Sequence, residues 1–457
     1  DRVIFGTVSD LELLGALRFM AQTPRTIPAS WHFIFHFGAF EGRPEHYAGE
    51  MRSLHSLQRR IAVELASLPY HRLQFLATTL GLVDQYARLG LPGVRLFDYP
   101  VSNDFSNLGL ESAATKGINQ RLRFVVAGGV RREKGQQALL AAISAEDSEF
   151  NRLSERVQLV VQTPKRPRWQ KQKLSLSPGV DPQVIEFAEH PLPREAYVEL
   201  IRSADCGVLM YDRQKYFCRR AGIFGEYAAA GKPMIVSAGS WLGDQLDEPA
   251  QRYAESLLHQ FPILNEVSPT ALEFNRTNVP QNGGVWSYDG TLHPFEVNLE
   301  LLPSTGGIVL EYQWHFPKQL GSHCQWDLYV GGERMGLSRV TTFHQSFATQ
   351  YVFFPTAFAQ RQVQLALRNP TANGTQGVYK ARIFELGPCV AEQPVSSVGL
   401  AVASAEQLGI AFAEIERQFD HYLFSAQEFG REWVRRHGPA NSLKTMLALH
   451  RRKQKTA

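Results

Sequence analysis

Residues 1–240 alternate between short apolar runs and amphipathic stretches, and this pattern constrains the fold more than any other feature of the sequence. Within residues 1–100, apolar runs predict buried strands at 3–7, 31–37, 73–78 and 94–97. Helical spacing between them predicts helices at 11–20, 44–67 and 82–89, and Ser9 or Asp10 is placed to cap the first one. Strands that alternate with helices are typical of βαβ units around a parallel sheet.

The same pattern restarts after a linker at about 101–120. Apolar runs predict further strands at 122–129, 157–161, 184–187, 206–210 and 233–237. Helical spacing predicts helices at 134–143, 194–203 and 222–230, and again near the end of the chain at 404–417 and 420–436. This second set of strands and helices predicts a second doubly wound domain.

Between about 265 and 390 the helical period disappears, and apolar residues alternate with period two. This alternation predicts short strands at 295–301, 308–314, 326–330, 351–354, 363–367 and 379–384. Turn signals such as Gly331-Gly332 and Asn373-Gly374 separate them. Many short alternating strands in one segment are typical of an antiparallel sandwich.

The sequence therefore predicts an α/β fold class with two Rossmann-like doubly wound domains, the second interrupted by an antiparallel β-sandwich. The predicted parts are a first Rossmann-like domain at 1–105, a second at 106–262 and 392–440, the sandwich at 263–391, and a basic tail at 441–457.

The net charge of +4 comes from local basic segments. Residues 443–457 carry five lysines or arginines and no acid, and residues 165–173 carry five more. Such segments attract nucleic acid, anionic lipid or phosphorylated substrates, or they are a solvated loop and a frayed tail. Because Trp169 is their single aromatic residue, we predict no nucleic-acid partner and keep peripheral contact of the tail with an anionic membrane as an option.

Other features exclude whole classes of protein. No uncharged apolar stretch reaches about 18 residues, so no segment is predicted to span a bilayer. The cysteines are too few and too scattered for a disulfide framework or a zinc site, and we expect reduced, buried thiols in a cytoplasmic protein. These cysteines are Cys206, Cys218, Cys324 and Cys389.

The first motif with chemical potential is a strand, a glycine-bearing turn and a helix at 127–135. Gly128 and Gly129 precede Arg131, Arg132 and Lys134. Backbone N–H groups at a helix start, together with cationic side chains, suit a diphosphate. The motif is neither a GxGxxG sequence nor a P-loop, so a tight βα turn with surface charges remains the alternative.

A second motif follows at 216–233, where an acid precedes small residues and Gly231-Lys232-Pro233. Gly222 would allow a close backbone approach at the helix start, and the Glu226 carboxylate could accept both hydroxyls of a ribose. Alternatively, Glu226 is an exposed helix acid favoured by the dipole. Tyr211 ends the preceding predicted strand, and ligands of open α/β sheets bind at the carboxyl ends of strands.

With these two motifs in order, residues 121–246 resemble the donor-binding half of GT-B glycosyltransferases, most like the retaining family-4 group. The resemblance implies that Lys134, with Arg131 or Arg219, stabilises the diphosphate leaving group of a nucleotide sugar. It implies further donor-binding residues. Separately, no Asp-x-Asp is placed at the end of a predicted strand, so we expect no tightly bound divalent metal. The donor-binding set is Gly128, Gly129, Arg132, Tyr211, Arg220, Gly222, Ile223 and Glu226.

The sequence departs from the family at identifiable positions. Cys218 stands where the family usually has a glutamate that contacts the donor sugar, and Gly129 stands where it has an arginine. Arg131 or Arg132 would substitute for that arginine. The acceptor domain of the family is longer than the residues that precede the linker here, so we expect a truncated or reduced first domain.

The function that the resemblance implies is transfer of a hexose from a nucleotide diphosphate sugar to a glycan or lipid-linked acceptor, with retention. No cofactor beyond the donor substrate is expected. One alternative is a non-catalytic glycan-binding protein that uses aromatic residues of the sandwich. Another is a sugar-nucleotide epimerase, which would need acid–base groups in the cleft. The aromatic residues in question are Trp286, Tyr288, Tyr312, Trp314, Trp326, Tyr329 and Tyr351.

Histidines of the first domain are a further open point. His32, His36 and His46 could lie near an inter-domain cleft and contact the donor sugar, or they could be packed or surface residues. No motif aligns one of them with a family position.

Overall fold

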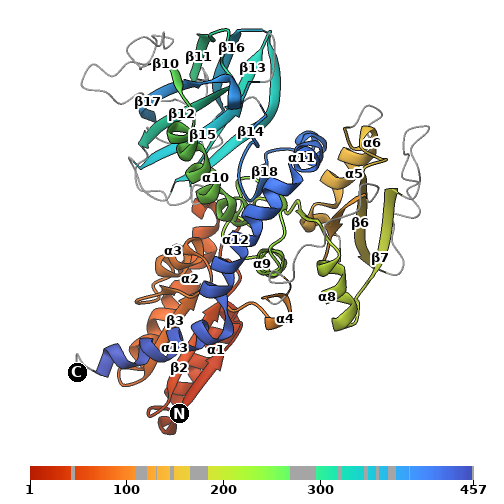
Figure 1. The fold of residues 1–457 in the computed structure, drawn as a ribbon. Coiled ribbons are helices and arrows are strands. Elements are labelled where there is room, and N and C mark those ends of the chain that lie inside the picture. Colours follow the sequence, from red (N-terminus) through yellow and green to blue (C-terminus); the bar gives the residue numbers. More distant parts are fainter. Residues whose placement is uncertain are drawn as a thin grey trace. The chain divides into compact units, whose positions relative to one another are not determined.

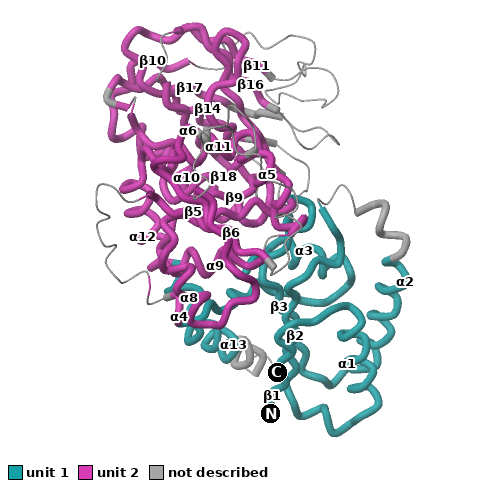
Figure 2. The backbone as a smooth tube through the Cα atoms, turned by 90° about the vertical axis from the view of Figure 1, so that its right-hand side faces the viewer, with its two compact units in different colours: residues 1–103, 213–222, 433–457 teal, residues 104–212, 223–432 magenta. Residues whose placement is uncertain are grey.

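The computed structural model describes most of the chain (Figure 1). The chain falls into two compact units (Figure 2). Unit 1 comprises Asp1–Asn103, Arg213–Gly222 and Trp433–Ala457, and unit 2 comprises Asp104–Asp212 and Ile223–Glu432. The predicted domain boundaries stay a prediction. The described residues are 1–42, 47–106, 108, 121–129, 131–144, 149–164, 184–267, 295–315, 322–343, 348–356, 360–368, 377–390 and 392–454.

Unit 1 contains a four-stranded parallel sheet in the order β1-β2-β3-β4, as the alternating pattern predicts. Ser9 caps the first helix, because its hydroxyl accepts a hydrogen bond from the Glu12 backbone N–H while the Glu12 carboxylate accepts one from the Ser9 backbone N–H. The elements are β1 (Arg2–Phe5), α1 (Asp10–Gln22), β2 (Ser30–Phe35), α2 (Tyr47–Ala66), β3 (Arg72–Ala77), α3 (Leu80–Arg88) and β4 (Arg95–Leu96).

The basic tail is helical over most of its length, which corrects the expectation of a frayed tail. Helix α13 spans Pro439–Gln454. Ser442 donates a hydrogen bond to the Asp98 carbonyl at 2.7 Å, and Met446 packs against the cluster that contains Phe97. These contacts within unit 1 hold the start of α13 in place, and the sequence pattern missed them because the apolar residues of this segment are few.

Unit 2 contains a six-stranded parallel sheet in the order β18-β9-β8-β5-β6-β7 (Figure 1). Strand β18 follows the sandwich strands in the chain and pairs with β9, so the chain returns to this sheet after about residue 390. The strands are β5 (Leu122–Val126), β6 (Val157–Pro164), β7 (Ile185–His190), β8 (Cys206–Leu209), β9 (Met234–Ser237) and β18 (Gly399–Val402).

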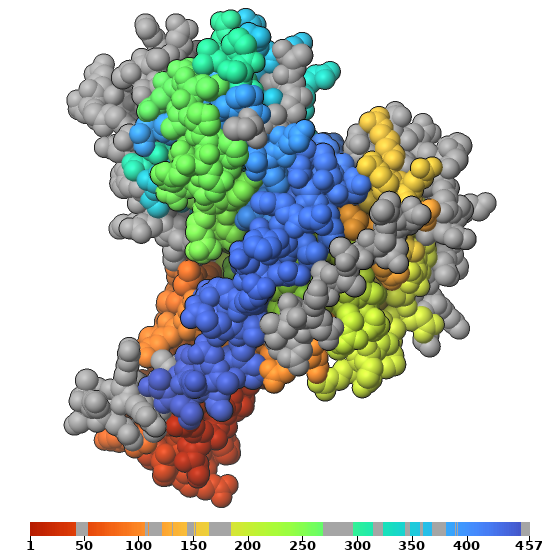
Figure 3. All heavy atoms as spheres, in the orientation of Figure 1, coloured from red at the N-terminus to blue at the C-terminus, as the bar shows by residue number. Residues whose placement is uncertain are grey.

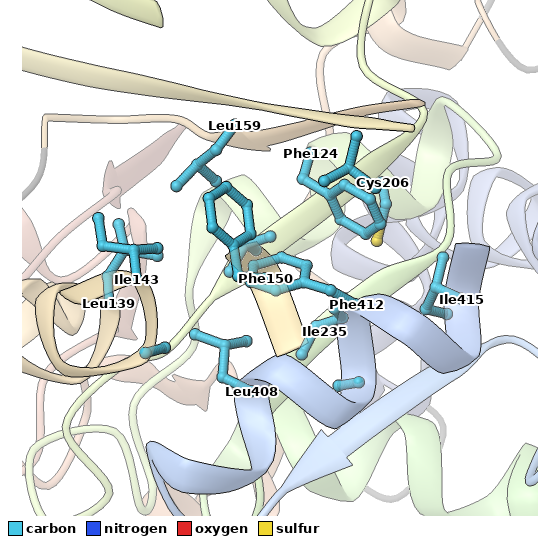
Figure 4. Close-up of a cluster of buried hydrophobic side chains, with 14 of the residues drawn as sticks. Phe124, Leu139, Ile143, Phe150, Leu159, Cys206, Ile235, Leu408, Phe412 and Ile415 are labelled. Atoms are coloured by element: carbon cyan, nitrogen blue, oxygen red, sulfur yellow. The ribbon is translucent and has the colours of Figure 1, made fainter. Parts of the chain in front are cut away.

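Helices cover this sheet, and their apolar faces form its core. Phe124, Phe150 and Phe412 point toward one another, with ring centroids of Phe412 at 4.8 Å from Phe124 and 5.4 Å from Phe150 (Figure 4). These rings are fully buried. The helices of unit 2 are α4 (Asn103–Ser106, from its second residue), α5 (Gln136–Ser144), α6 (Glu149–Arg152), α8 (Arg194–Arg202), α9 (Gly222–Ala229, from its second residue), α10 (Trp241–Gln260), α11 (Glu406–Arg417) and α12 (Phe419–His437, up to Glu432).

The predicted antiparallel sandwich consists of two four-stranded sheets, β10-β17-β12-β15 and β11-β16-β13-β14. Strands β10 and β14 were not predicted; β14 contains Gly336 at φ 63, which interrupts the alternating pattern. The strands are β10 (Ile263–Val267), β11 (Phe295–Glu300), β12 (Gly307–His315), β13 (Ser322–Val330), β14 (Glu333–Phe343), β15 (Thr349–Pro355), β16 (Gln362–Arg368) and β17 (Gly377–Leu386).

Two aromatic residues of the sandwich that could have stacked on sugars are buried instead. Tyr312 and Trp326 lie inside the core between the sheets and are about 1% exposed. Trp286 and Tyr288 lie outside the described residues, and nothing is described of the Trp314 side chain. Tyr329 and Tyr351 are half-buried. Burial of the two core rings therefore excludes them from contact with a glycan.

The sandwich packs on α10 and α11 through apolar and polar contacts. Leu257 of α10 is buried with Val309 and Phe353 of the sandwich. Another side chain of α10, Tyr253, contacts His421 of α12. Figure 3 shows α10 in green beside α11 and α12 in blue. The packing joins the sandwich and the parallel sheet within unit 2.

Asp247 of α10 is the most strongly perturbed carboxyl of this packing. It is 8% exposed and accepts hydrogen bonds from the Thr342 backbone N–H at 2.7 Å and from the Gln251 side chain at 2.9 Å. Burial, with smaller contributions from Asp244 and Glu248, raises the pKa of Asp247 to about 7. The unfolded chain would ionise this group near pH 4.

Because the folded state holds this proton up to a higher pH than the unfolded state, the free energy of unfolding should fall as pH rises from about 4 to about 7. The loss attributable to Asp247 is about 4 kcal/mol. Asp247→Asn should remove this slope, so the gain in stability of the variant over the wild type should be clearly larger at pH 8 than at pH 5. Urea denaturation at both pH values measures it, with exposed Asp420→Asn as the control. An unchanged slope in Asp247→Asn would contradict the assignment.

In the part of the chain that the structure describes, we find no helix with the length and apolar character needed to cross a membrane.

Candidate functional site

The first predicted motif forms a tight turn at the carboxyl end of β5. Gly128 and Gly129 have φ of 84 and 68, values that favour glycine. The Gly128 backbone N–H donates to the Gln162 side-chain oxygen at 2.6 Å, and the Gln162 amide donates to the Glu189 carbonyl at 3.1 Å. A Cβ on Gly128 would lie 2.0 Å from Ile223 Cδ1, so the glycine also allows α9 to approach the turn.

Lys134 lies on a short 3₁₀ turn that precedes α5. Its ammonium donates a hydrogen bond to the Gly128 carbonyl at 2.7 Å and lies 5.7 Å from the centroid of the Tyr211 ring. Gly135 follows at φ 84, where a Cβ would lie 2.0 Å from the Met210 carbonyl oxygen. The close approach of this turn to the end of β8 thus fixes the direction in which Lys134 projects.

Glu226 lies on the second turn of α9, one turn after Ile223. One of its carboxylate oxygens accepts a hydrogen bond from the Tyr197 hydroxyl of α8 at 2.6 Å. Burial raises the pKa of Glu226, while the Tyr197 hydrogen bond and the charge of Lys134 lower it. Glu226 is therefore a partly buried acid held in one orientation and within electrostatic reach of Lys134. It is not the freely exposed helix acid of the alternative interpretation.

Sequence reasoning missed Tyr197. Its ring packs edge-on against Phe105 at 6.1 Å between centroids, and burial, reinforced by Glu226, raises the pKa of its hydroxyl. The phenol stays protonated and donates to Glu226. Tyr197 is thus a positioning residue for the carboxylate, and no local pattern in α8 distinguishes it from other helix residues.

Sequence reasoning also missed His190, the last residue of β7. Its ring lies over the Gly129 backbone, where a Cβ on Gly129 would be 2.8 Å from His190 Nε2. Burial first, and then the charges of Lys134 and Arg131, lower the pKa of His190. Its buried Nδ1 atom has no hydrogen-bond partner among the described residues. The carboxyl end of a parallel strand was the signal that could have identified it.

The structure brings part of the predicted set together in unit 2. Gly128, Lys134, Tyr211, Ile223 and Glu226 lie at neighbouring ends of β5, β8 and α9, and Gly129 lies beside them. The arginines of the first motif point to solvent: Arg131 is exposed and pairs with Glu133 at 2.9 Å, and Arg132 is also exposed.

The remaining predicted site residues, Arg219, Arg220 and Gly222, belong to unit 1. Gly222 is also the first residue of α9, whose other residues belong to unit 2. The Arg219 guanidinium lies over the rings of Phe37 and Tyr216, at 4.5 and 5.0 Å from their centroids. Arg220 donates to the Tyr99 carbonyl at 2.8 Å, and burial lowers the pKa of its guanidinium to about 10. Both arginines are thus engaged inside unit 1, and their phosphate-binding role stays a prediction.

Cys218 is a buried thiol of unit 1 rather than an exposed group. A Cβ on Gly81 would lie 2.5 Å from its sulfur, and its carbonyl accepts a hydrogen bond from the Thr79 hydroxyl at 2.5 Å. Because the thiol belongs to an apolar core cluster, burial of a glutamate carboxylate at this position would be costly. Cys206 and Cys324 are likewise buried thiols.

The histidines of the first predicted domain differ from one another. His32 is 1% exposed within β2, so it is a core residue. His36 Nε2 lies 2.8 Å from the Gly6 carbonyl, and burial lowers the pKa of His36. His46 lies outside the described residues, as do Val130 and the basic run at 165–173.

The geometry of unit 2 can hold two chemically different parts of one ligand. The Lys134 ammonium beside the glycine turn suits an anion, and the Glu226 carboxylate suits hydroxyl donors. Among the described residues, no group of three or more histidines, cysteines or acids is placed to hold a metal ion.

No protein-family model matches the chain, and no curated protein matches its sequence. Among solved structures, it is similar to a UDP-forming α,α-trehalose-phosphate synthase from Burkholderia xenovorans, with 14% identity, TM-score 0.36, and coverage of 54% of this chain and 61% of that chain. It is also similar to HepE of Anabaena in complex with UDP-glucose, with 13% identity, TM-score 0.34, and coverage of 55% and 63%.

A shorter match is CBM35 from Cellvibrio japonicus Abf62, with 11% identity, TM-score 0.22, and coverage of 27% of this chain and 96% of that one. The matched part of the chain covers less than two thirds of the length of the trehalose-phosphate synthase and HepE structures. At these identities and TM-scores, the similarity assigns neither a family nor an activity to this chain.

Proposed function

We propose that the chain is a glycosyltransferase of the GT-B type and binds a nucleotide diphosphate sugar at the carboxyl edge of the unit 2 sheet. The observation that carries the proposal is the placement of a cation and an acid at this edge. Lys134 donates to the carbonyl of the glycine turn. Burial raises the pKa of Glu226, and the charge of Lys134 opposes that rise, so the two groups lie within electrostatic reach of each other. A nucleoside diphosphate has a dianionic or trianionic group next to a ribose diol, which matches this pair.

In this proposal Lys134 balances the charge that grows on the departing diphosphate when the bond to the sugar breaks. Such preorganised electrostatic stabilisation is worth several kcal/mol, about 3–4 for one well-placed donor. The Gly129 backbone N–H would add a hydrogen bond to the phosphates, since the Gly128 N–H is bonded to the Gln162 side chain. Glu226 would accept hydrogen bonds from the ribose, with Tyr197 holding its carboxylate in place. Arg131 and Arg132 are further proposed donor-binding residues of unit 2, while a phosphate-binding role for Arg219 and Arg220 stays a prediction from the sequence.

The reaction proposed in more detail is transfer of a hexose, with retention of its anomeric configuration, to a glycan or a lipid-linked acceptor. For a lipid-linked acceptor, α13 offers a place for peripheral membrane contact. Leu443 and Leu447, one turn apart, are 56% and 37% exposed, and Lys444 lies between them. Exposed apolar residues beside cations favour an anionic membrane surface.

Glu226→Gln tests the ribose contact separately from the phosphate contact. We expect the variant to bind the preferred nucleoside diphosphate about 10–100-fold more weakly, because it loses a charge-assisted hydrogen bond or two. Its affinity for inorganic pyrophosphate should be unchanged. Isothermal titration calorimetry with UDP, ADP, GDP and pyrophosphate measures both.

The matched control is Glu195→Gln, which removes an exposed acid from the first turn of α8 and should bind all four compounds as the wild type does. Equal nucleotide affinities for Glu226→Gln and wild type would refute the ribose assignment. If no nucleoside diphosphate binds the wild type, the donor site itself is refuted.

The buried Cys218 favours a second candidate, a non-catalytic glycan-binding protein on the same scaffold. The thiol is packed in the apolar core of unit 1, where burial of the carboxylate that the resemblance would place there would be costly. The two candidates separate in one assay. A glycosyltransferase releases nucleoside diphosphate from a nucleotide sugar in the presence of an acceptor, whereas the second candidate does not release it with any nucleotide sugar.

A further inference from the structure

The outer face of the sheet β11-β16-β13-β14 carries a groove that the proposed donor site does not use. The groove has a volume of about 550 Å³ and is lined by residues of β11, β16 and β13 and by the turn after β13. In Figure 1 these three strands lie side by side. The lining residues are Asn298, Leu299, Glu300, Tyr329, Gly331, Gly332, Gln362, Val363 and Gln364. Pockets of roughly 300–1,000 Å³ hold small ligands in proteins.

Period-two alternation places polar side chains on this face. Val297, Leu299, Val363 and Leu365 point into the sandwich core. Their neighbours along the strands therefore point outward. Pairing aligns them in a row, because Asn298 of β11 is opposite Gln364 of β16, which is opposite Tyr329 of β13. A second pair, Glu300 and Gln362, lies next to the row.

Two members of the row are held by neighbouring acids. The Gln364 amide donates a hydrogen bond to the Glu296 carboxylate at 3.0 Å. The Tyr329 hydroxyl lies 3.5 Å from the Asp327 carboxylate, which is buried. These contacts orient the Gln364 carbonyl oxygen and the Tyr329 ring. By contrast, the side chains of Asn298, Glu300 and Gln362 make no hydrogen bond to any described residue, so their donors and acceptors face the groove solvent.

The chemistry of the lining selects the class of ligand. No lysine or arginine is among the described residues that line the groove, so phosphates and other polyanions lack a counter-charge there. Amides, a carboxylate and a phenol are instead donors and acceptors for hydroxyl groups. The ring of Tyr329 adds an apolar surface for the C–H face of a sugar. Gly331 and Gly332 form a turn with φ of 59 and 86. Because these glycines have no side chains, they leave this end of the groove open.

We infer that this groove is a glycan-binding site for a neutral oligosaccharide, with Asn298, Gln364 and Tyr329 as its main contacts. The site lies on the sandwich and is separate from the residues proposed to hold the nucleotide. It would hold an acceptor or product chain independently of the donor. Of the aromatic residues that the sequence suggested for this role, Tyr329 lines the groove, whereas Tyr312 and Trp326 lie in the core.

Calorimetric titration of the full chain tests the inference with four neutral probes: hexaoses of β-1,4-glucan, α-1,4-glucan, β-1,4-mannan and β-1,4-xylan. At least one is expected to bind. Asn298→Ala and Gln364→Ala should each weaken that binding about 5–10-fold, since each loses hydrogen bonds to hydroxyls. Tyr329→Ala should weaken it about 10-fold or more through loss of the ring face.

Gln313→Ala is the matched control, because Gln313 is a half-buried amide on the other sheet and should leave binding unchanged. If Tyr329→Ala fails to fold by thermal melting, Tyr329→Phe and Gln362→Ala take its place, with expected losses of about 5-fold. Binding of none of the probes overturns the inference. The inference is also overturned if the groove variants bind the oligosaccharide with the same affinity as the Gln313→Ala control.

Lys134→Ala separates this result from the proposed donor site. The variant should lose nucleotide binding but keep oligosaccharide binding. Failure of the groove thus appears as absent or insensitive oligosaccharide binding, whereas failure of the donor site appears only in the nucleotide titration.

Discussion

Lys134→Ala is expected to weaken binding of the preferred nucleoside diphosphate about 100-fold, because the variant loses the cationic donor of charge-assisted hydrogen bonds to the phosphates at the glycine turn. Turnover should fall about 100–1,000-fold, since the same charge stabilises the departing diphosphate in the transition state. Unlike Glu226→Gln, this variant should also lose affinity for inorganic pyrophosphate. Calorimetry and a nucleoside diphosphate release assay measure the two effects.

A second cation of unit 2 provides the control for Lys134. Arg202 lies on the exposed side of α8, where it pairs with Glu199 at 2.7 Å. Arg202→Ala removes the same charge from unit 2 but should leave pyrophosphate affinity and turnover unchanged. Lys134→Arg should restore part of the affinity, because it restores the charge without the same reach. Wild-type pyrophosphate affinity in Lys134→Ala would exclude a phosphate-binding role for this side chain.

Gly135→Ala is expected to lower the free energy of unfolding by about 2–5 kcal/mol. About 1–2 kcal/mol comes from the left-handed backbone, since Gly135 has φ 84. A further 1–3 kcal/mol or so comes from crowding, because the added Cβ would lie 2.0 Å from the Met210 carbonyl oxygen and the backbone must shift. Urea denaturation followed by circular dichroism measures the loss.

Gly336→Ala separates the two contributions. Gly336 also has a left-handed φ of 63, but a Cβ there would meet nothing within 4 Å. This variant should lose only about 1–2 kcal/mol, from backbone strain alone. Equal losses for Gly135→Ala and Gly336→Ala would show that the turn relaxes around Met210, and Lys134 would then not be fixed in the direction described.

Elements with a strong local pattern could be predicted from the sequence, and those shaped by distant contacts could not. The capping sequence at Ser9 and Glu12 and the apolar runs of β5, β6 and β8 act over a few residues, so their structure follows from neighbours in the chain. Strand β14 was missed because Gly336 breaks its alternation, and its place in the sheet depends on pairing with β13.

The same distinction holds for the candidate site. Lys134 and Glu226 stand out in the sequence as a charged turn and an acid near a helix start. Tyr197 and His190 do not, since each gains its significance only from a partner on another element, Glu226 and Gly129. For the sandwich, alternation marks which residues share a face, but it does not say which face is the core.

The sequence by itself determined the parallel sheets and the switch to antiparallel strands, because periods of 3.6 and 2 are properties of short stretches of chain. Only the tertiary structure decided that Tyr312 and Trp326 are core residues while Asn298, Gln364 and Tyr329 line an open groove. Burial of a side chain depends on which sheets stack on which face, and residues far apart in the chain make that choice together.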